Sequence, residues 1–380
     1  MRPGQSPPPQ PIFPKLFPRP TGRNGWERVV QVADRLSGTA WDEFEALPSA
    51  QLDRDRTRRL MRTAPMAELR DDLLAASGMP FVSPRTSMDF RTELPDLASF
   101  RKVARFLAAV LFDAAAGGNR RDVVPIAESG MRIARAVRGE AVIGTLVAVA
   151  AETILLRRIV QIAPLLSEAD ADGLGLGLLA LARDRTPWRE GFERESRMLI
   201  GMLGASDRSG TRETLEEEAN PETRAIARLF GDGAEAAVAR ARAMDRVRQS
   251  LAQTLGQLDD PARYGAAAPP PSKDPTDRMI DAILPATHRV VGRILQVATE
   301  ERLTGLYLRA WAARRRRLEW PPTLAGLAGP EDLRQVAAAA PIEYAVLPDG
   351  DAVVLRARPI PTGPEDPGRP IQVPPARSTG

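Results

Sequence analysis

The densest cluster of charged and aromatic side chains in the sequence is a run of four arginines between two tryptophans, made up of Trp311, Arg314, Arg315, Arg316, Arg317 and Trp320. Guanidinium groups bind phosphates and carboxylates, and indole rings stack on nucleobases. Side chains at four consecutive helical positions point around most of the helix circumference, and cations in a last helical turn interact favourably with the helix dipole. We therefore interpret the run as a solvated helix end and keep a phosphate-binding patch as the alternative.

Glu152 is a second candidate for chemistry because it follows the most apolar stretch of the chain, Ala141–Ala151. A carboxylate that is buried among apolar side chains must pair with a cation or take a raised pKa. We predict that Arg132 or Arg135, on the preceding helix, pairs with Glu152 in a structural ion pair. A general acid or base would need a second carboxylate, which the sequence does not place.

Two short motifs that could bind ligands lack the residues that this chemistry needs. The acidic segment that begins at Glu168 has the start of a calcium-binding loop, but its twelfth position, which needs a bidentate Glu, is Leu179. Gly173, Gly175 and Gly177 have glycines spaced as in a dinucleotide-binding loop, without the strand that must precede one. We predict a helix start for the first motif and close helix packing for the second.

The composition excludes several kinds of catalysis. The chain has no Cys and a single His, His288, which excludes disulfides, thiolate zinc sites, iron–sulfur clusters and a cysteine nucleophile. The formal net charge is +4, and Arg2, Lys15, Arg19 and Arg23 account for that excess, so the remainder of the chain is formally neutral. The overall charge therefore identifies no partner, and we expect no metal and no cofactor.

The elements that position these residues are helices over most of the chain. Apolar residues recur with helical spacing, most clearly in the stripe Leu97, Phe100, Val103, Ala104, Leu107, Val110 and Leu111. Further helices are expected over residues 168–183, 187–203, 221–230, 234–257, 275–284 and 286–317. Consecutive helices joined by short Gly or Pro turns indicate a mostly α fold of stacked antiparallel αα-hairpins, similar to a helical repeat.

Near the C-terminus the spacing of the apolar residues changes from that of a helix to that of a strand. Ile342, Tyr344 and Val346 alternate along the chain. Asp349-Gly350 is a tight-turn dipeptide, and the residues after it are rich in β-branched side chains. This pattern predicts a small C-terminal β-hairpin. It must pack on the long preceding helix, because an isolated hairpin is not stable in water.

Proline marks the organisation of the chain, because it is concentrated at both ends and near residue 270. We interpret residues 1–23 and 359–380 as disordered Pro-rich tails. A helical domain over 24–258 is followed by a linker over 259–274. Residues 275–358 form the long helix and the β-hairpin, which we expect to pack on the helical domain.

The sequence also carries an expectation about the compartment. No segment has the apolar core of a signal peptide, and the most apolar stretch is shorter than the ~20 residues of a membrane span. A chain without Cys suits either redox environment, so composition does not decide between them. We predict a cytoplasmic protein with no membrane span in this chain, and leave export open.

The C-terminal part has a recognisable order of segments. The long helix ends in Arg-Leu-Glu and is followed by Trp320-Pro321-Pro322-Thr323-Leu324, then by Tyr344 and the Asp-Gly hairpin. This order resembles the tail of uncharacterised, mostly helical bacterial proteins and the C-terminal part of type II secretion pseudopilins. The prepilin N-terminal helix and the Asp-Pro-Trp segment near the pseudopilin calcium loop are absent from the sequence. The resemblance implies a fold for this part of the chain and no mechanism.

These features favour a non-catalytic protein-interaction or scaffold protein, whose stacked hairpins present a groove to an unknown protein partner. The alternative is a weak nucleic-acid-binding protein that uses Arg314–Arg317 and the basic N-terminal tail. An enzyme that uses carboxylates such as Glu152 is the third hypothesis. An exposed apolar patch favours the scaffold, steep salt dependence of binding favours nucleic acid, and a wet pocket beside Glu152 favours the enzyme.

Overall fold

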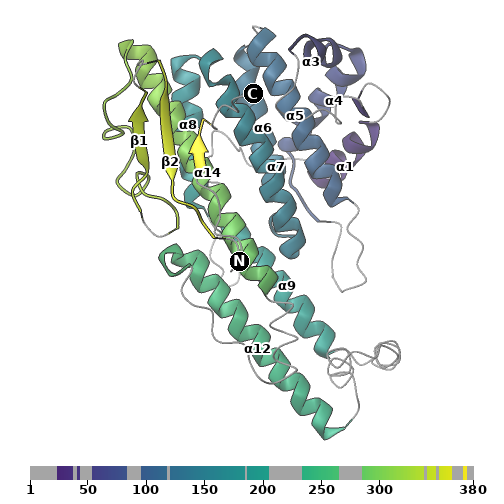
Figure 1. Ribbon diagram of the computed structural model, residues 1–380. Coiled ribbons are helices and arrows are strands. Elements are labelled where there is room, and N and C mark those ends of the chain that lie inside the picture. Colours follow the sequence, from purple (N-terminus) through teal and green to yellow (C-terminus); the bar gives the residue numbers. More distant parts are fainter. Residues whose placement is uncertain are drawn as a thin grey trace, which may run out of the picture.

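The computed structural model describes the chain over residues 24–36, 41–42, 54–83, 96–117, 120–184, 186–204, 233–264, 285–337, 340–347, 351–361 and 371–374. This described part is mostly helical, with packed helix pairs and a small antiparallel sheet near the C-terminus (Figure 1). The fold class predicted from the sequence is therefore confirmed. The N-terminal tail, most of the linker, and the helices expected over 221–230 and 275–284 lie outside the described residues.

Three helices, α1 (Gly25–Arg35), α3 (Arg54–Met61) and α4 (Ala64–Ser77), lie on the N-terminal side of the molecule, on the right in Figure 1. Asn24 is the N-cap of α1, and its side chain accepts a hydrogen bond of 3.0 Å from the backbone N–H of Trp26. Helices α1 and α3 pack on α5, and α4 packs on α1 and α6. These helices therefore cover one side of the central helices.

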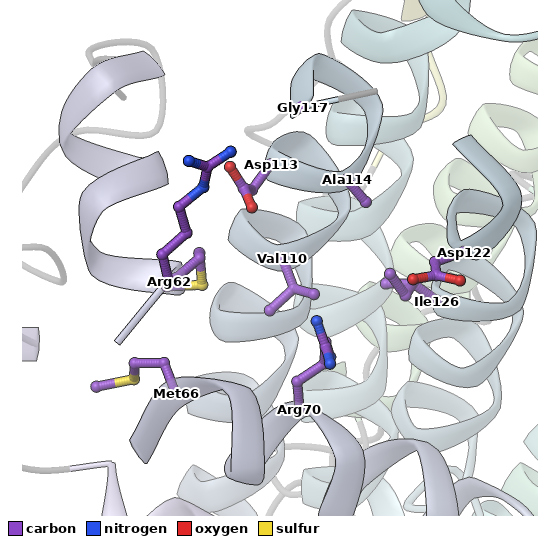
Figure 2. A pocket seen from close by; sticks show the side chains of 10 residues that line it. Arg62, Met66, Arg70, Val110, Asp113, Ala114, Gly117, Asp122 and Ile126 are labelled. Carbon is purple, nitrogen blue, oxygen red and sulfur yellow. The ribbon is translucent and has the colours of Figure 1, made fainter. Parts of the chain in front are cut away.

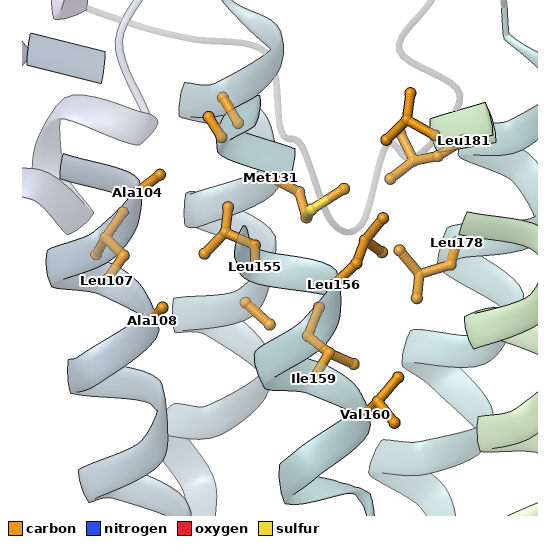
Figure 3. Close-up of a cluster of buried hydrophobic side chains, with 14 of the residues drawn as sticks. Ala104, Leu107, Ala108, Met131, Leu155, Leu156, Ile159, Val160, Leu178 and Leu181 are labelled. Atoms are coloured by element: carbon orange, nitrogen blue, oxygen red, sulfur yellow. The ribbon is translucent and has the colours of Figure 1, made fainter. Parts of the chain in front are cut away.

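The central helices are α5 (Leu97–Gly117), α6 (Val123–Arg135), α7 (Ala141–Ile162) and α8 (Glu168–Arg183), with the short 3-10 helix η2 (Arg120–Asp122) before α6. Figure 3 shows α7 between α5 and α8, with apolar side chains of all four helices in contact. Its labelled side chains are Ala104, Leu107, Ala108, Met131, Leu155, Leu156, Ile159, Val160, Leu178 and Leu181. Helix α7 is the apolar helix predicted from the sequence. Neither it nor any other helix in the described ranges is long and apolar enough to span a bilayer.

The longest helix, α14 (Pro285–Arg317), packs chiefly on α8. Ser167 caps α8, because its hydroxyl accepts a hydrogen bond of 3.1 Å from the backbone N–H of Asp170. The two helices cross where Gly175 faces Gly305, and a Cβ at either position would lie 2.8 Å from the backbone oxygen of the other. The predicted close helix packing is therefore confirmed at Gly175, whereas it is wrong at Gly173, which is exposed and would meet no atom within 4 Å.

Two further helices, α9 (Thr186–Gly204) and α12 (Ala234–Asp259), pack on each other and extend below the other helices in Figure 1. An ion pair of 2.6 Å between Arg189 and Asp259 joins α9 to the end of α12. Helix α9 also packs on α7, and the 3-10 helix η4 (Pro261–Arg263) follows α12. This pair is anchored to the central helices through α9.

The C-terminal sheet has three antiparallel strands in the order β1 (Glu343–Val346), β2 (Val353–Ala357) and β3 (Ile371–Val373). Strands β1 and β2 form the predicted hairpin, in which Glu343 pairs with Arg356. Strand β3 was not expected, because it lies within the Pro-rich segment interpreted as a tail. Its two apolar side chains are buried, and β2 and β3 both contact α14. The sheet therefore packs on the long helix.

Candidate functional site

The four predicted arginines lie in the last turn of α14. The helix ends at Arg317, and Leu318 follows with a φ of 64°. This left-handed conformation turns the chain out of the helix. The segment that follows lies beside the last turns of α14, since residues of both line one cavity. The end of α14 therefore meets the start of α8, the sheet and this segment.

The two tryptophans pack against other side chains of the same protein. Trp311 and Trp320 have ring centroids 5.4 Å apart, and the Arg314 guanidinium lies over both rings, at 5.4 and 4.8 Å. Tyr307 packs against Trp320 with ring centroids 6.4 Å apart. Arg314 also donates a hydrogen bond of 2.8 Å to the backbone oxygen of Asp351. The indole faces are therefore largely covered.

The other three arginines have separate surroundings. Arg315 donates to the backbone oxygen of Pro164 at 3.2 Å, and Arg316 donates to the Glu168 carboxylate at 2.7 Å. Arg317 makes no hydrogen bond or ion pair within the part of the chain that the structure describes. The run therefore does not form one continuous basic face, and Arg317 is the member that a ligand can approach without breaking a contact.

A cavity of about 290 Å³ lies beside this helix end. Its charged lining consists of Asp172, Arg309, Arg316 and Arg317, and Ala313 and uncharged residues of the segment 321–327 complete it. The Nε of Arg309 donates to Asp172 at 3.0 Å, which balances one of the three positive charges. We call this space the arginine cavity. Its excess of guanidinium groups suits an anionic group of modest size.

Glu152 lies in a group of buried charged side chains. The Arg138 guanidinium donates to both Glu152 oxygens, one of them at 2.7 Å, and its Nη2 lies 3.4 Å from a Glu301 oxygen. The same guanidinium lies 3.6 Å from the centre of the Trp188 ring. We call Arg138, Glu152, Trp188 and Glu301 the buried ion cluster. It joins the turn after α6 to α7, α9 and α14.

The predicted partner of Glu152 was wrong. The arginine that binds Glu152 is Arg138, in the turn between α6 and α7, and not Arg132 or Arg135 on α6 itself. Arg135 donates instead to the backbone oxygen of Leu181 at 3.2 Å. The prediction considered only the preceding helix, whereas the turn that reverses the chain places Arg138 beside α7.

Glu301 is the second carboxylate that acid–base chemistry at Glu152 would need. Burial raises the pKa of Glu301 to about 8, and the nearby Glu152 charge adds to the rise, while Arg135 and Arg138 oppose it. Arg138 bridges the two carboxyl groups, because its guanidinium donates to Glu152 and lies 3.4 Å from a Glu301 oxygen. Such a pair can serve as general acid and base where a substrate reaches it.

The side chains of this pair and of Arg138 have almost no exposed surface. Arg138 and Glu152 are 0 % exposed and Glu301 is 1 % exposed. The arginine cavity and two further cavities, which lie along α5 (Figure 2) and α8, are lined by other residues. Nor do three or more His, Asp or Glu side chains gather as metal ligands anywhere in the ranges that the structure describes. The geometry therefore supports a structural role for the cluster.

Sequence reasoning missed Arg138, Trp188 and Glu301. A signal for Glu301 was present, because it lies seven residues from both Ile294 and Leu308, two helical turns in either direction. Both of these apolar residues are buried, so the charge falls on the inner face of α14. No comparable signal identified Arg138 or Trp188, since each lies at a helix boundary.

The exposed apolar patch expected of a scaffold is small. Ile143 and Leu146, one turn apart on α7, are 46 % and 37 % exposed. Exposed apolar side chains in ones and twos are normal on protein surfaces. These two residues therefore do not define a docking face.

Comparison of the chain with protein-family models, with curated proteins and with solved structures finds no match. The likeness of the C-terminal part to pseudopilins remains a prediction. The function is therefore argued from the geometry of the arginine cavity and the buried ion cluster.

Proposed function

We propose that this chain is a non-catalytic protein-interaction protein that binds an acidic segment of a protein partner in the arginine cavity. The observation that carries the proposal is the excess of guanidinium groups in that cavity. Arg309 is balanced by Asp172, and Arg316 faces Glu168, but Arg317 has no partner among the described residues. A carboxylate of the partner can accept hydrogen bonds from Arg317 and from the Arg316 nitrogen that Glu168 does not bind.

A protein partner fits this surface better than nucleic acid does. Single-stranded nucleic acid binds on exposed aromatic rings along a continuous basic groove. Here Arg314 lies over the rings of Trp311 and Trp320, and Arg315 is turned toward a backbone oxygen. This cavity is compact and offers few free guanidinium groups. It therefore suits the carboxylate of a side chain better than it suits an extended phosphate backbone.

The buried ion cluster supports the non-catalytic part of the proposal. It holds the carboxyl pair that an acid–base enzyme would use, but these side chains have at most 1 % exposed surface. A general acid or base must lie within hydrogen-bond reach of the group it serves. Glu152 and Glu301 instead face Arg138, which donates to Glu152 and lies 3.4 Å from a Glu301 oxygen.

Binding of defined probes to the full chain tests the proposal. Fluorescence anisotropy at ~0.15 M salt, where distant charges are screened, compares a labelled poly-glutamate peptide with a single-stranded oligonucleotide of equal charge. We expect tighter binding of the peptide. Replacing Arg316 and Arg317 together by Ser is expected to weaken peptide binding about tenfold, equivalent to ~1.4 kcal/mol, because two donors are lost. The Arg316–Glu168 pair is exposed, so its loss leaves stability nearly unchanged.

The matched control replaces Arg101 and Arg197 by Ser. These exposed arginines lie on α5 and α9, outside the cavity, and the control removes the same charge. We expect it to bind the peptide as the wild type does. If peptide binding is weakened equally in the two double variants, the peptide is attracted by the net charge of the protein and not by the arginine cavity. Tighter binding of the oligonucleotide, with steep salt dependence, would support the nucleic-acid alternative instead.

A further inference from the structure

Strand β1 lies at one edge of the C-terminal sheet and pairs with β2 along one side only (Figure 1). Leu347, directly after β1, donates its backbone N–H to the oxygen of Ala352 at 2.9 Å. Hydrogen-bonded and non-hydrogen-bonded pairs alternate along antiparallel strands, so every second residue of β1 bonds to β2 as Leu347 does. The backbone N–H and C=O groups of Tyr344 and Val346, which lie between those residues, therefore point away from β2.

These outward backbone groups have no partner among the residues that the structure describes. The preceding outward residue, Ile342, donates its N–H to the oxygen of Leu333 at 2.9 Å. No such bond is made by the backbone of Tyr344 or Val346 within the described ranges. Val346 is 40 % exposed. We call residues 343–347 the free edge, because they follow the bond at Ile342 and end where the hairpin closes.

The free edge also lacks the features that usually prevent an exposed strand from pairing further. Natural edge strands carry Pro, Lys, a bulge or an inward-pointing charge for this purpose. Strand β1 reads Glu-Tyr-Ala-Val and follows β2 in unbroken register. Alternating backbone donors and acceptors along such an edge are the partner of another extended chain. The occupant of the free edge is therefore a β-strand.

We propose that the free edge pairs with the same edge of a second copy of this chain, antiparallel and about a two-fold axis at Ala345. Tyr344 of each copy then lies opposite Val346 of the other copy, and the two residues exchange N–H···O bonds in both directions. Each residue has one backbone donor and one acceptor, so this arrangement satisfies all the outward groups of both copies.

The side chains of the free edge suit a second copy of the same strand. At the axis Ala345 meets Ala345 of the other copy, so the smallest side chain of β1 lies where the two strands are identical. Glu343 lies opposite Leu347 of the other copy, so no like charges oppose each other. Tyr344 opposite Val346 is an aromatic and β-branched pair, of the kind that stabilises antiparallel sheets.

This contact is isologous and small, which gives a closed but weak and reversible dimer. The two C-terminal sheets join into one sheet across the axis. No residue of the free edge lines the arginine cavity. The inference is therefore independent of the proposed binding of an acidic segment, and each can fail while the other stands.

Single cysteines report this pairing directly, because the chain has no Cys of its own. In the proposed dimer the two Ala345 residues form a non-hydrogen-bonded pair with Cα atoms about 4.5 Å apart, within the range of a disulfide. We expect the full chain with Ala345→Cys, oxidised by diamide, to form a disulfide-linked dimer about tenfold faster or more than Ala241→Cys does. Ala241 is an exposed alanine on α12, outside the sheet.

Glu343→Cys tests the register. The two copies of residue 343 are four residues apart along the paired strands, about 13 Å, which is too far for a disulfide. This variant alone should cross-link no faster than Ala241→Cys. An equal mixture of Glu343→Cys and Leu347→Cys should cross-link rapidly, because these two positions lie opposite each other.

Val346→Pro tests the backbone bonds. It removes only an outward N–H, so the bonds between β1 and β2 remain. Added to Ala345→Cys, it should slow cross-linking about tenfold, because both N–H donors of Val346 are lost from the dimer. Val346→Thr, which keeps the N–H, should not slow it. Circular dichroism verifies folding, and the cysteine variants keep the proposal falsifiable if the proline variant unfolds.

Sedimentation of the wild-type chain completes the test. We expect a dimer fraction that rises with concentration. Equal cross-linking of Ala345→Cys and Ala241→Cys would overturn the proposal, and so would rapid cross-linking of Glu343→Cys alone. A wild-type chain that stays monomeric, with cross-linking unaffected by Val346→Pro, would also overturn it and leave the free edge to a strand of a different protein.

Discussion

At Arg138, a guanidinium with no exposed surface is held by two carboxyl groups and an indole ring. Removing a charge from water is unfavourable, and the attraction of a well-placed partner offsets this loss. Such a pair contributes little net stability compared with apolar residues, but breaking it leaves an unpaired buried charge. The cluster therefore makes stability depend strongly on each of its members.

Glu152→Ala is expected to destabilise the protein by about 3–5 kcal/mol, because it leaves the buried Arg138 charge without its main partner. Urea denaturation followed by circular dichroism measures the change. The comparison variant is Glu168→Ala, which removes a half-exposed carboxylate from an ion pair with Arg316 and should cost at most about 1 kcal/mol. Similar losses in the two variants would contradict the structural importance of the cluster.

Glu301 makes stability depend on pH. Its pKa is raised from 4.5 to about 8 in the folded chain, so between these values only the folded state holds the proton and stability falls as the pH rises. Glu301→Gln keeps the size of the side chain and an oxygen that faces Arg138, but it cannot titrate. We expect the free energy of unfolding of this variant to fall less steeply over that window, by up to ~1.4 kcal/mol per pH unit.

Denaturation curves at a series of pH values check this expectation, and Glu128→Gln is the comparison. Burial raises the pKa of Glu128, on α6, to about 7. The Glu128 variant should therefore also lose part of the pH dependence of stability, independently of the Glu301 variant. A wild-type slope in the Glu301 variant between its ordinary pKa and about pH 8 would show that Glu301 is ionised in the folded protein.

Among the elements, the crossing of α8 and α14 depends on two residues without side chains. Gly175 and Gly305 let the two backbones approach until a Cβ on either would meet the other's carbonyl oxygen. Arg309, one turn after Gly305, also passes close to Gly175 on its way to Asp172. The same crossing therefore fixes one wall of the arginine cavity.

Gly175→Ala is expected to destabilise the protein by ~1–3 kcal/mol, because the added methyl group forces the two helices apart. Gly173→Ala, two residues earlier on the exposed face of α8, meets no atom within 4 Å and should stabilise the helix by about 0.5–1 kcal/mol. Thermal denaturation of both variants gives the sign. A destabilised Gly173 variant, or a stabilised Gly175 variant, would contradict this account of the crossing.

At the scale of the whole molecule, the C-terminal segments hold α8 and α14 in place. Asp332 is buried and binds Arg183 of α8, with one hydrogen bond of 3.0 Å. Arg302 of α14 donates to the backbone oxygen of Glu331 at 3.0 Å, and Gln296 donates to that of Ile360 at 3.1 Å. Strand β3 completes the sheet that packs on α14.

Removal of residues 362–380, which include β3, is expected to destabilise the protein by on the order of 3 kcal/mol, since Ile371 and Val373 lose their burial. The control truncation removes only residues 375–380 and keeps the strand. Urea denaturation measures stability, and hydrogen exchange of β2 reports the loss of its neighbour. Equal stability of both truncated chains and the full chain would show that β3 contributes nothing.

Local patterns in the sequence predicted the helices well. The stripe on α5, the cap of α1 and the bounds of α8 all depend on residues within a few positions of one another. Strand β3 was missed because three alternating residues among prolines carry little signal on their own. Pairing with β2 and burial against α14 make it a strand, and both are long-range contacts.

The candidate site was harder to predict for the same reason. The arginine run was placed correctly at a helix end, since four adjacent residues define it. The cavity beside it requires the segment 321–327 and Asp172 of α8 to meet the end of α14, which no spacing rule specifies. Likewise the partner of Glu152 depends on how one turn reverses the chain.

The separation of 163 residues between Arg138 and Glu301 has a consequence for biosynthesis. A ribosome completes α6 and α7 long before it reaches α14, and domains of a nascent chain begin to fold as they emerge. Until α14 arrives, the Arg138–Glu152 pair and the apolar face of α8 stay in contact with water or chaperones. The early helices therefore finish packing only when nearly the whole chain has been made, and a prematurely terminated product is left open to proteases.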